Sequence, residues 1–204
     1  MVTNIVLTGV GGQGIIFVSR VLAESAKAAN LGVYVGEVHG MSQRGGTVTS
    51  FIRIGDVHSS LVPAGETTIL LGMEIGETYR AKQYISRNTW VVTNNRRIVP
   101  LSVSKDGAVY PQPAEIEGAL RELSDNVLCL DAAKIAKASG AAIAENAAML
   151  GAVVSTGGLP ISKEVVREEL LKRVKGKWQE QNLKAFRGGL KLGQQLLAAK
   201  HQKS

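Results

Sequence analysis

The sequence is poor in residues that build covalent cross-links and metal clusters. Its 204 residues include one cysteine, Cys129, and three histidines, none of them at metal-ligand spacing. One cysteine forms no internal disulfide, and an iron–sulfur cluster needs about four thiolate ligands. We therefore expect no metal site and no disulfide framework in this chain. Cys129 lies in the apolar run 127–130, which is typical of a buried structural thiol.

Aromatic residues and long apolar runs are also scarce. Only 4% of the residues are aromatic, and no nucleic-acid-binding motif is present. No apolar stretch has the length of a transmembrane helix. The amino terminus leads directly into a strand-like segment, without the charged start of a signal peptide. We expect a cytoplasmic protein that binds neither nucleic acid nor a membrane.

The net charge of +7 comes entirely from the C-terminal region. Residues 163–204 contain 11 Lys and Arg against 4 Glu, whereas residues 1–162 contain 13 charges of each sign. The basic residues alternate with glutamates and with apolar positions at helical spacing, which favours a solvated helix face. Contact with an acidic partner chain or an anionic cofactor is the alternative.

The beginning of the chain has the pattern of a strand–helix–strand unit. Residues 2–8 form a short β-branched run, and a glycine-rich turn follows at 9–14. An apolar stripe predicts a helix over 15–30, and 33–38 reads as a second strand. Such a unit predicts a Rossmann-like α/β fold: an open, mainly parallel sheet with helices on both faces.

The remaining segments continue this alternation. We expect strands at 47–54, 57–62, 67–73, 89–93 and 126–130, a hairpin over 98–110, and helices at 74–86, 115–123, 132–139 and 143–154. Asp131 is expected to cap the helix that follows it. We expect residues 1–160 to form the core, and 161–204 a helical C-terminal extension that packs on it.

The first candidate site is the turn Gly9-Val10-Gly11-Gly12-Gln13-Gly14. It has the G-x-G-x-x-G spacing between a strand and a helix, where glycines allow close approach of a phosphate to the helix N-terminus. We expect cofactor binding by five of its residues, namely Gly9, Gly11, Gly12, Gln13 and Gly14. Glu37, at the end of the second strand, fits the position of a ribose-binding acid. The motif alone leaves open a dinucleotide, another phosphate-bearing ligand or a purely structural turn.

The second candidate site is the loop after the second strand. It contains Met41, Ser42, Gln43, Arg44, Gly45 and Gly46. In an open parallel sheet this loop emerges at the ligand-binding edge. Arg44 could hold a carboxylate or phosphate through two hydrogen bonds, and the two glycines permit close backbone approach. We expect a substrate-facing or subunit-facing edge here.

The sequence shows no catalytic constellation. It has no nucleophile elbow, no P-loop, no zinc motif and no carboxylate pair with acid–base spacing. We therefore predict no catalytic residue in this chain, and we expect the chemistry to lie on a partner.

The two glycine motifs together resemble a known family. Gly-Val-Gly-Gly-Gln-Gly at 9–14 and Met-Ser-Gln-Arg-Gly-Gly at 41–46, with Thr-Gly-Gly-Leu-Pro at 156–160, are similar to the gamma-type domain of 2-oxoacid:ferredoxin oxidoreductases. Within that family the sequence at 41–46 resembles that of the small (beta) subunit of the indolepyruvate enzymes. The resemblance covers nearly the whole chain.

The resemblance implies a reaction shared with a partner. These enzymes oxidatively decarboxylate a 2-oxoacid with coenzyme A to an acyl-CoA, carbon dioxide and reduced ferredoxin, and the indolepyruvate type accepts aryl pyruvates. The resemblance assigns thiamine diphosphate, magnesium and the iron–sulfur clusters to a large alpha subunit. It implies that this chain holds no firmly bound cofactor, closes the active site and contributes to binding of coenzyme A or substrate. The isolated chain could then form homo-oligomers through the surface that the partner covers.

Two other functions compete with this interpretation. A free-standing NAD(P)-binding protein would explain the glycine turn and Glu37, and tight NADH binding would support it. A regulatory module would use the Rossmann-like core only as a docking surface, and normal activity of the complex without this chain would support that.

Overall fold

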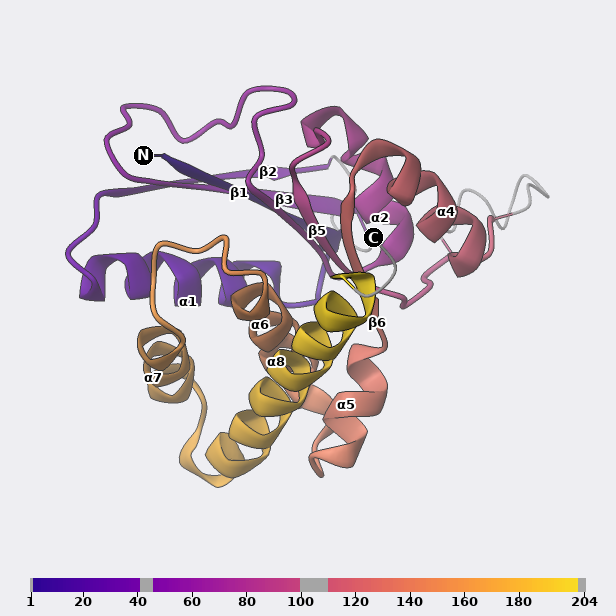
Figure 1. Cartoon of the computed structure of the whole chain (residues 1–204). Helices are drawn as coiled ribbons and strands as arrows, with labels where there is room; N and C mark the ends of the chain where they lie inside the picture. Colours follow the sequence, from indigo (N-terminus) through magenta and orange to yellow (C-terminus); the bar gives the residue numbers. More distant parts are fainter. Residues whose placement is uncertain (1, 41–45, 100–109, 202–204) are drawn as a thin grey trace.

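The computed structural model describes residues 2–40, 46–99 and 110–201. In these residues six strands form one sheet in the order β2-β3-β1-β4-β5-β6 (Figure 1). The strands are β1 (Thr3–Val10), β2 (Val33–His39), β3 (Thr47–Ile54), β4 (Ile69–Gly72), β5 (Trp90–Asn94) and β6 (Asn126–Leu130). β1, β4, β5 and β6 are parallel, whereas β3 runs antiparallel to both β1 and β2.

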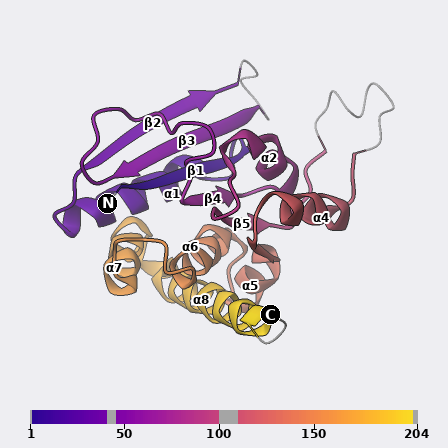
Figure 2. The same ribbon diagram turned by 45° about the horizontal axis from the view of Figure 1, so that its top comes forward.

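Helices cover the two faces of the sheet unequally (Figure 2). One face carries α1 (Ile15–Ala28), α5 (Ala132–Ala138), α6 (Glu145–Ser155), α7 (Lys163–Arg173) and α8 (Gln179–His201). The other carries α2 (Ile75–Arg80) and α4 (Pro113–Leu123). Short 3₁₀ turns, η1 (Lys82–Tyr84), η2 (Ala142–Ala144) and η3 (Gly176–Trp178), connect them. The predicted mainly parallel sheet with helices on both faces is confirmed.

The central strands are apolar on both sides because both faces of the sheet are covered there. In β1, Ile5 and Leu7 belong to the larger core under α1 and α6, whereas Val6 belongs to the smaller core under α2 and α4. β4 repeats this division with Leu71 and Leu70. Continuous apolar runs are typical of strands that are buried on both faces.

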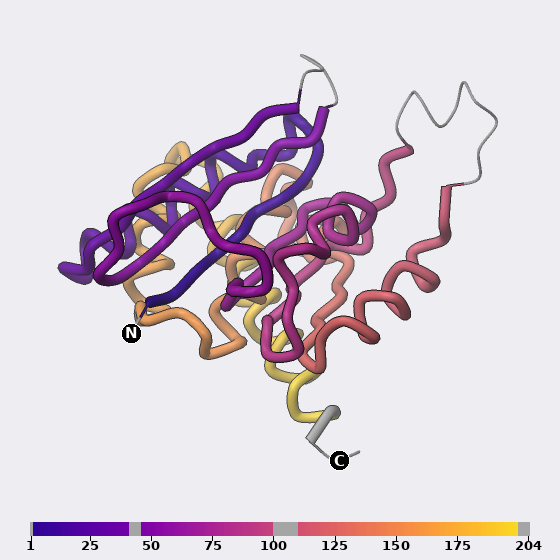
Figure 3. The backbone as a smooth tube through the Cα atoms, turned by 90° about the horizontal axis from the view of Figure 1, so that it is seen from above, coloured from indigo at the N-terminus to yellow at the C-terminus, as the bar shows by residue number. Residues whose placement is uncertain are grey.

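The edge of the sheet departs from the predicted strand–helix–strand unit. β2 does not pair with β1, because β3 lies between them and forms an antiparallel hairpin with β2. Viewed from above, this hairpin and α4 lie at opposite ends of the molecule (Figure 3). On the face away from α1 no described helix covers the hairpin. Instead, Arg53 of β3 donates to the carbonyls of Ser59 and Leu61 in the loop that crosses it.

Three further predictions were wrong in detail. Residues 57–62 form no strand but a loop, in which Arg53 of β3 donates to two carbonyls and the Ser60 side chain lies close to Gly36 of β2. The helix predicted over 74–86 ends at Arg80 and is followed by η1, and the helix predicted from residue 143 begins at Glu145 after η2. The hairpin predicted over 98–110 falls almost wholly outside the described residues.

The C-terminal helices belong to the larger core. α8 lies against α6, where Gly151 of α6 faces the backbone of Phe186 and Gly189 of α8 faces that of Ala148. This close approach buries Phe186, which is 2% exposed, and burial of such a ring stabilises a fold by about 1.5–3 kcal/mol. None of the helices in the described part of the chain is long and apolar enough to span a membrane.

Asp131 took the structural role predicted for it, whereas Cys129 is less buried than predicted. The Asp131 carboxylate accepts a hydrogen bond from the backbone N–H of Lys134 at 2.8 Å, so it caps α5. Cys129 is half-buried and unpaired. Burial, followed by the nearby Glu117 carboxylate, raises the pKa of its thiol to about 12, which suits a structural thiol rather than a nucleophile.

Candidate ligand site at the carboxyl edge of the sheet

A crevice forms where the helix connections change faces. β1 is followed by α1 on one face of the sheet, and the adjacent parallel strand β4 is followed by α2 on the other. In open α/β sheets, ligands bind outside the carboxyl ends of strands at such a point. The glycine turn 9–14 lies at this end of β1.

The backbone of the turn presents free N–H groups. Gly12 and Gly14 have φ angles of 93° and 78°, a left-handed conformation that favours glycine. Within the described residues their N–H groups donate to no acceptor, and the N-terminus of α1 directly follows. The Gln13 N–H between them donates to the Val10 carbonyl at 3.1 Å, so the two glycine N–H groups are those available to an anion at this helix N-terminus.

Gln13 has a structural role that the sequence did not reveal. Its side-chain oxygen accepts from the Val10 N–H at 2.7 Å, and its side-chain nitrogen donates to the Met73 carbonyl at 3.0 Å. The amide therefore ties the β1–α1 turn to the residue after β4, across the crevice. Gly9 is required beside it, because a Cβ there would lie 2.8 Å from the Gln13 oxygen.

A pocket of about 230 Å³ opens at the glycine turn. This glycine-loop pocket is lined by Gly12, Gln13, Gly14, Met73, Arg96, Ala142, Ile143, Glu145 and Asn146. The N-terminus of α6 also faces it, so the positive ends of two helix dipoles converge on one pocket.

Arg96 supplies a cation to this pocket. Its guanidinium donates to both carboxylate oxygens of Glu145, at 3.0 and 2.9 Å, and its side chain remains 47% exposed. Glu145 thus orients Arg96 and also adds a negative charge to the wall. Arg96 was not among the predicted site residues, although its place just after β5 marks the same edge of the sheet.

The second candidate loop adjoins the first. The Gly11 N–H donates to the Gly46 carbonyl at 2.9 Å, so the structure brings the turn 9–14 and the end of the 41–46 loop together. Met41, Ser42, Gln43, Arg44 and Gly45 lie outside the described residues.

Glu37 does not lie where a ribose-binding acid would. It is on β2, and β3 separates that strand from β1, a distance of about 10 Å at the usual strand spacing. Its carboxylate is 4.0 Å from the imidazole of His39 on the same strand. The arrangement disfavours the dinucleotide-binding alternative.

A buried carboxylate organises the start of α2. Glu74 is fully buried and accepts from the N–H groups of Glu77 and Ile98, at 2.7 and 3.1 Å, and from the Tyr110 hydroxyl at 3.1 Å. Burial and the adjacent Glu74 raise the pKa of Tyr110 to about 12. These hydrogen bonds give Glu74 a structural role at the start of α2.

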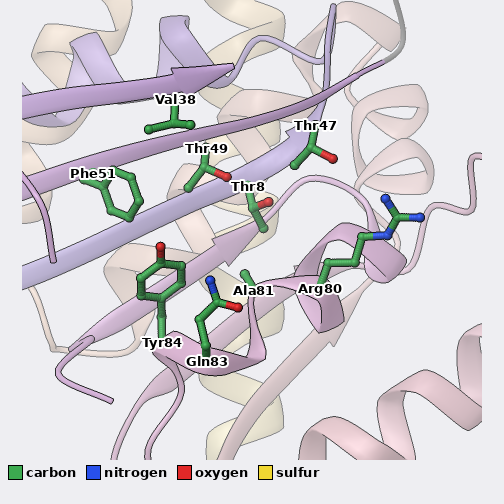
Figure 4. Close-up of a pocket in the computed structure, with 9 residues that line it drawn as sticks. All are labelled: Thr8, Val38, Thr47, Thr49, Phe51, Arg80, Ala81, Gln83 and Tyr84. Atoms are coloured by element: carbon green, nitrogen blue, oxygen red, sulfur yellow. The ribbon is translucent and has the colours of Figure 1, made fainter. Parts of the chain in front are cut away.

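A second hollow lies on the face of the sheet that carries α2 and α4 (Figure 4). This threonine hollow, of about 270 Å³, is lined by Thr8, Val38, Thr47, Thr49, Phe51, Arg80, Ala81, Gln83 and Tyr84. The phenol of Tyr84 and the amide of Gln83 point toward the strands. The buried Glu77 carboxylate accepts from Thr47 at 2.7 Å and pairs with Arg80, and both of these partners line the hollow.

Comparison with known proteins identifies the family. Residues 4–192 match the model for pyruvate ferredoxin/flavodoxin oxidoreductases. The chain is 40% identical over 196 residues to indolepyruvate oxidoreductase subunit IorB of Pyrococcus horikoshii, covering 95% of this chain and 97% of that one. It is 38% identical over 186 residues to the same subunit of Archaeoglobus fulgidus, covering 91% and 92%. The chain belongs to the pyruvate ferredoxin/flavodoxin oxidoreductase family.

Solved structures of this family share the fold. The gamma subunit of a keto/oxoacid ferredoxin oxidoreductase from Geobacter sulfurreducens superposes with a TM-score of 0.67 at 23% identity, over 94% of this chain and 98% of that one. A 2-oxoglutarate:ferredoxin oxidoreductase from Magnetococcus marinus, with 2-oxoglutarate, coenzyme A and succinyl-CoA bound, matches 95% of this chain within 31% of its own. Its TM-score is 0.67 at 22% identity.

These matches confirm the resemblance seen in the sequence. The chain is a small subunit of a 2-oxoacid:ferredoxin oxidoreductase, and the free-standing nucleotide-binding alternative is not favoured. Among the described residues, no group of three or more His, Cys, Asp or Glu side chains is arranged to hold a metal ion.

Proposed function

We propose that this chain is the small subunit of an indolepyruvate-type oxidoreductase, and that its glycine-loop pocket holds a phosphate of coenzyme A. A large partner subunit would carry thiamine diphosphate, which stabilises the carbanion left by decarboxylation, and iron–sulfur clusters, which pass electrons to ferredoxin. The relatives named as indolepyruvate oxidoreductase subunits support the aryl pyruvate class. The single unpaired cysteine suits the cytoplasm.

One observation carries the coenzyme A part of the proposal. Gly12, Gly14 and Arg96 line the same pocket, and the N–H groups of the two glycines donate to no acceptor among the described residues. N–H groups at a helix N-terminus together with an arginine are a common phosphate-binding set. A phosphate here would lie at the turn whose Gly11 N–H donates to the Gly46 carbonyl, so the rest of the coenzyme could extend toward Gly46 and the partner.

The role of the second loop follows from this placement. We propose that Met41 to Gly46 face the active site of the assembled enzyme, and that Arg44 binds a carboxylate or phosphate there. Unchanged coenzyme A affinity, substrate affinity and assembly in an Arg44→Ala variant would contradict this role.

The Arg96→Ala variant tests the phosphate site. In the assembled complex we expect coenzyme A to bind at least about tenfold more weakly, because the cation is lost and the Glu145 carboxylate then faces the phosphate. The KM of the 2-oxoacid should stay unchanged. Coenzyme A affinity is measured by titration calorimetry.

Arg87→Ala is the matched control. Arg87 is an exposed arginine that pairs with Asp125 at the other end of β5. Equal coenzyme A affinity in the Arg96→Ala and Arg87→Ala variants would contradict phosphate binding in this pocket.

A further inference from the structure

A second pocket adjoins the glycine-loop pocket on the side of α1. It has a volume of about 340 Å³ and lies between α1, the start of α6 and the connection from α7 to α8. Ile143 and Asn146 line both pockets, so the two hollows meet at these side chains. We call it the Trp178 pocket. One ligand of sufficient length can occupy both.

The walls of the Trp178 pocket suit a planar ring. Phe17, Trp178 and Ile143 provide apolar surface, and Ile143 is 71% exposed although it is a large aliphatic side chain. Uncovered apolar surface in a concave site is typical of a ligand-binding position.

A buried amide adds a polar contact. Asn182 is 5% exposed, and its side-chain nitrogen donates to the Trp178 carbonyl at 2.9 Å. Its side-chain oxygen receives no hydrogen bond from any residue that the structure describes, and Asn182 lines the pocket. The free oxygen can accept from the amino group of a heterocyclic base.

The two cationic side chains of this pocket, Arg173 and Lys175, differ in their carboxylate partners. Arg173 is already engaged by Glu169 at 2.6 Å and by Glu24 at 3.8 Å. Lys175 pairs with no carboxylate in the described part of the chain. A ring-binding pocket with one free cation, next to a phosphate site, fits a nucleotide with an additional phosphate.

We propose that the Trp178 pocket binds the nucleoside end of coenzyme A, and that Lys175 recognises its 3′-phosphate. This inference rests on the proposed function, because it requires that one phosphate of the coenzyme's diphosphate lies in the glycine-loop pocket. The pantetheine arm then points away from α7, toward Gly46 and the partner. Lys175 is thereby a specificity residue for coenzyme A over dephospho-coenzyme A.

Binding of coenzyme A fragments by the assembled complex tests the inference. Wild-type protein should bind coenzyme A about five- to tenfold more tightly than dephospho-coenzyme A. Lys175→Ala should abolish this preference by weakening only coenzyme A. Lys177→Ala is the matched control and should keep the preference, because Lys177 lies over the Trp178 ring, 5.4 Å from its centroid, and does not line the pocket.

A second variant tests the nucleoside itself. Ile143→Ser should weaken coenzyme A and dephospho-coenzyme A alike, and by more than 4′-phosphopantetheine, which has no nucleoside and occupies only the glycine-loop pocket that Ile143 also lines. Since Ile143 is largely exposed, the variant should fold normally.

Two outcomes separate this inference from the proposed function. A preference for the 3′-phosphate that survives Lys175→Ala, while Arg96→Ala still weakens coenzyme A, would overturn the inference alone. Coenzyme A affinity that is insensitive to Arg96→Ala would overturn both.

Discussion

At the residue scale, Tyr110 and Glu74 form a buried pair whose stability depends on pH. The pKa of Tyr110 is about 12, above its ordinary value of 10, so the folded state favours the protonated phenol. A raised folded-state pKa contributes stability that is fully present below pH 10 and is lost as the pH rises from 10 through 12. The phenolate would face the Glu74 carboxylate directly.

Tyr110→Phe should reveal this contribution. Near pH 8 we expect the variant to be less stable by about 1–2 kcal/mol, because Glu74 loses a hydrogen-bond donor. Between pH 10 and 12 the difference should shrink, since only the wild type loses the tyrosine contribution. Urea unfolding across this range measures it. A difference that stays constant with pH would show that the phenol does not titrate against Glu74.

The sequence predicted the roles of some individual residues and not those of others. Asp131 was predicted correctly as a cap because capping depends on neighbours along the chain. Gln13 was expected at a ligand, yet its amide bonds Val10 and Met73. Arg96 was missed, because only the fold brings it to the glycine turn.

At the scale of elements, the contact between α6 and α8 depends on glycine. A Cβ at Gly189 would overlap the backbone of Ala148, which no side-chain rotation can relieve. We expect Gly189→Ala to destabilise the protein by about 1–3 kcal/mol, a typical cost of overpacking. The midpoint of thermal unfolding should fall accordingly.

Gly118→Ala provides the control for this prediction. Gly118 is an exposed residue of α4, and a Cβ there would contact nothing within 4 Å. Alanine should stabilise this helix by about 0.5–1 kcal/mol through its higher helix propensity. If both alanine variants raised the unfolding midpoint, helix propensity rather than close packing would govern α8.

The elements themselves were largely predictable from their patterns, and their pairing was not. The buried strands β1, β4 and β6 have the short apolar runs that predict them. Insertion of β3 between β1 and β2 depends on hydrogen bonds between distant segments, and an antiparallel hairpin has no signature here beyond its polar, glycine-bearing loop. That insertion removes Glu37 from the glycine turn.

At the scale of the molecule, the groups proposed to bind a ligand gather at one edge of the sheet. Free N–H groups, Arg96 and the two adjoining pockets lie at the carboxyl edge of the sheet. The buried Glu74 and Glu77, by contrast, are bonded to structural partners. This arrangement is consistent with the proposal that a partner subunit completes the reaction.

Dependence of catalysis on this chain tests that account most directly. The chain is co-expressed anaerobically with the large subunit from the same source, and viologen reduction is followed with indolepyruvate and coenzyme A. We predict dye reduction that requires both subunits and both substrates, with neither subunit active alone. Full activity of the large subunit without this chain, or an isolated chain that binds NADH tightly and does not assemble, would contradict the account.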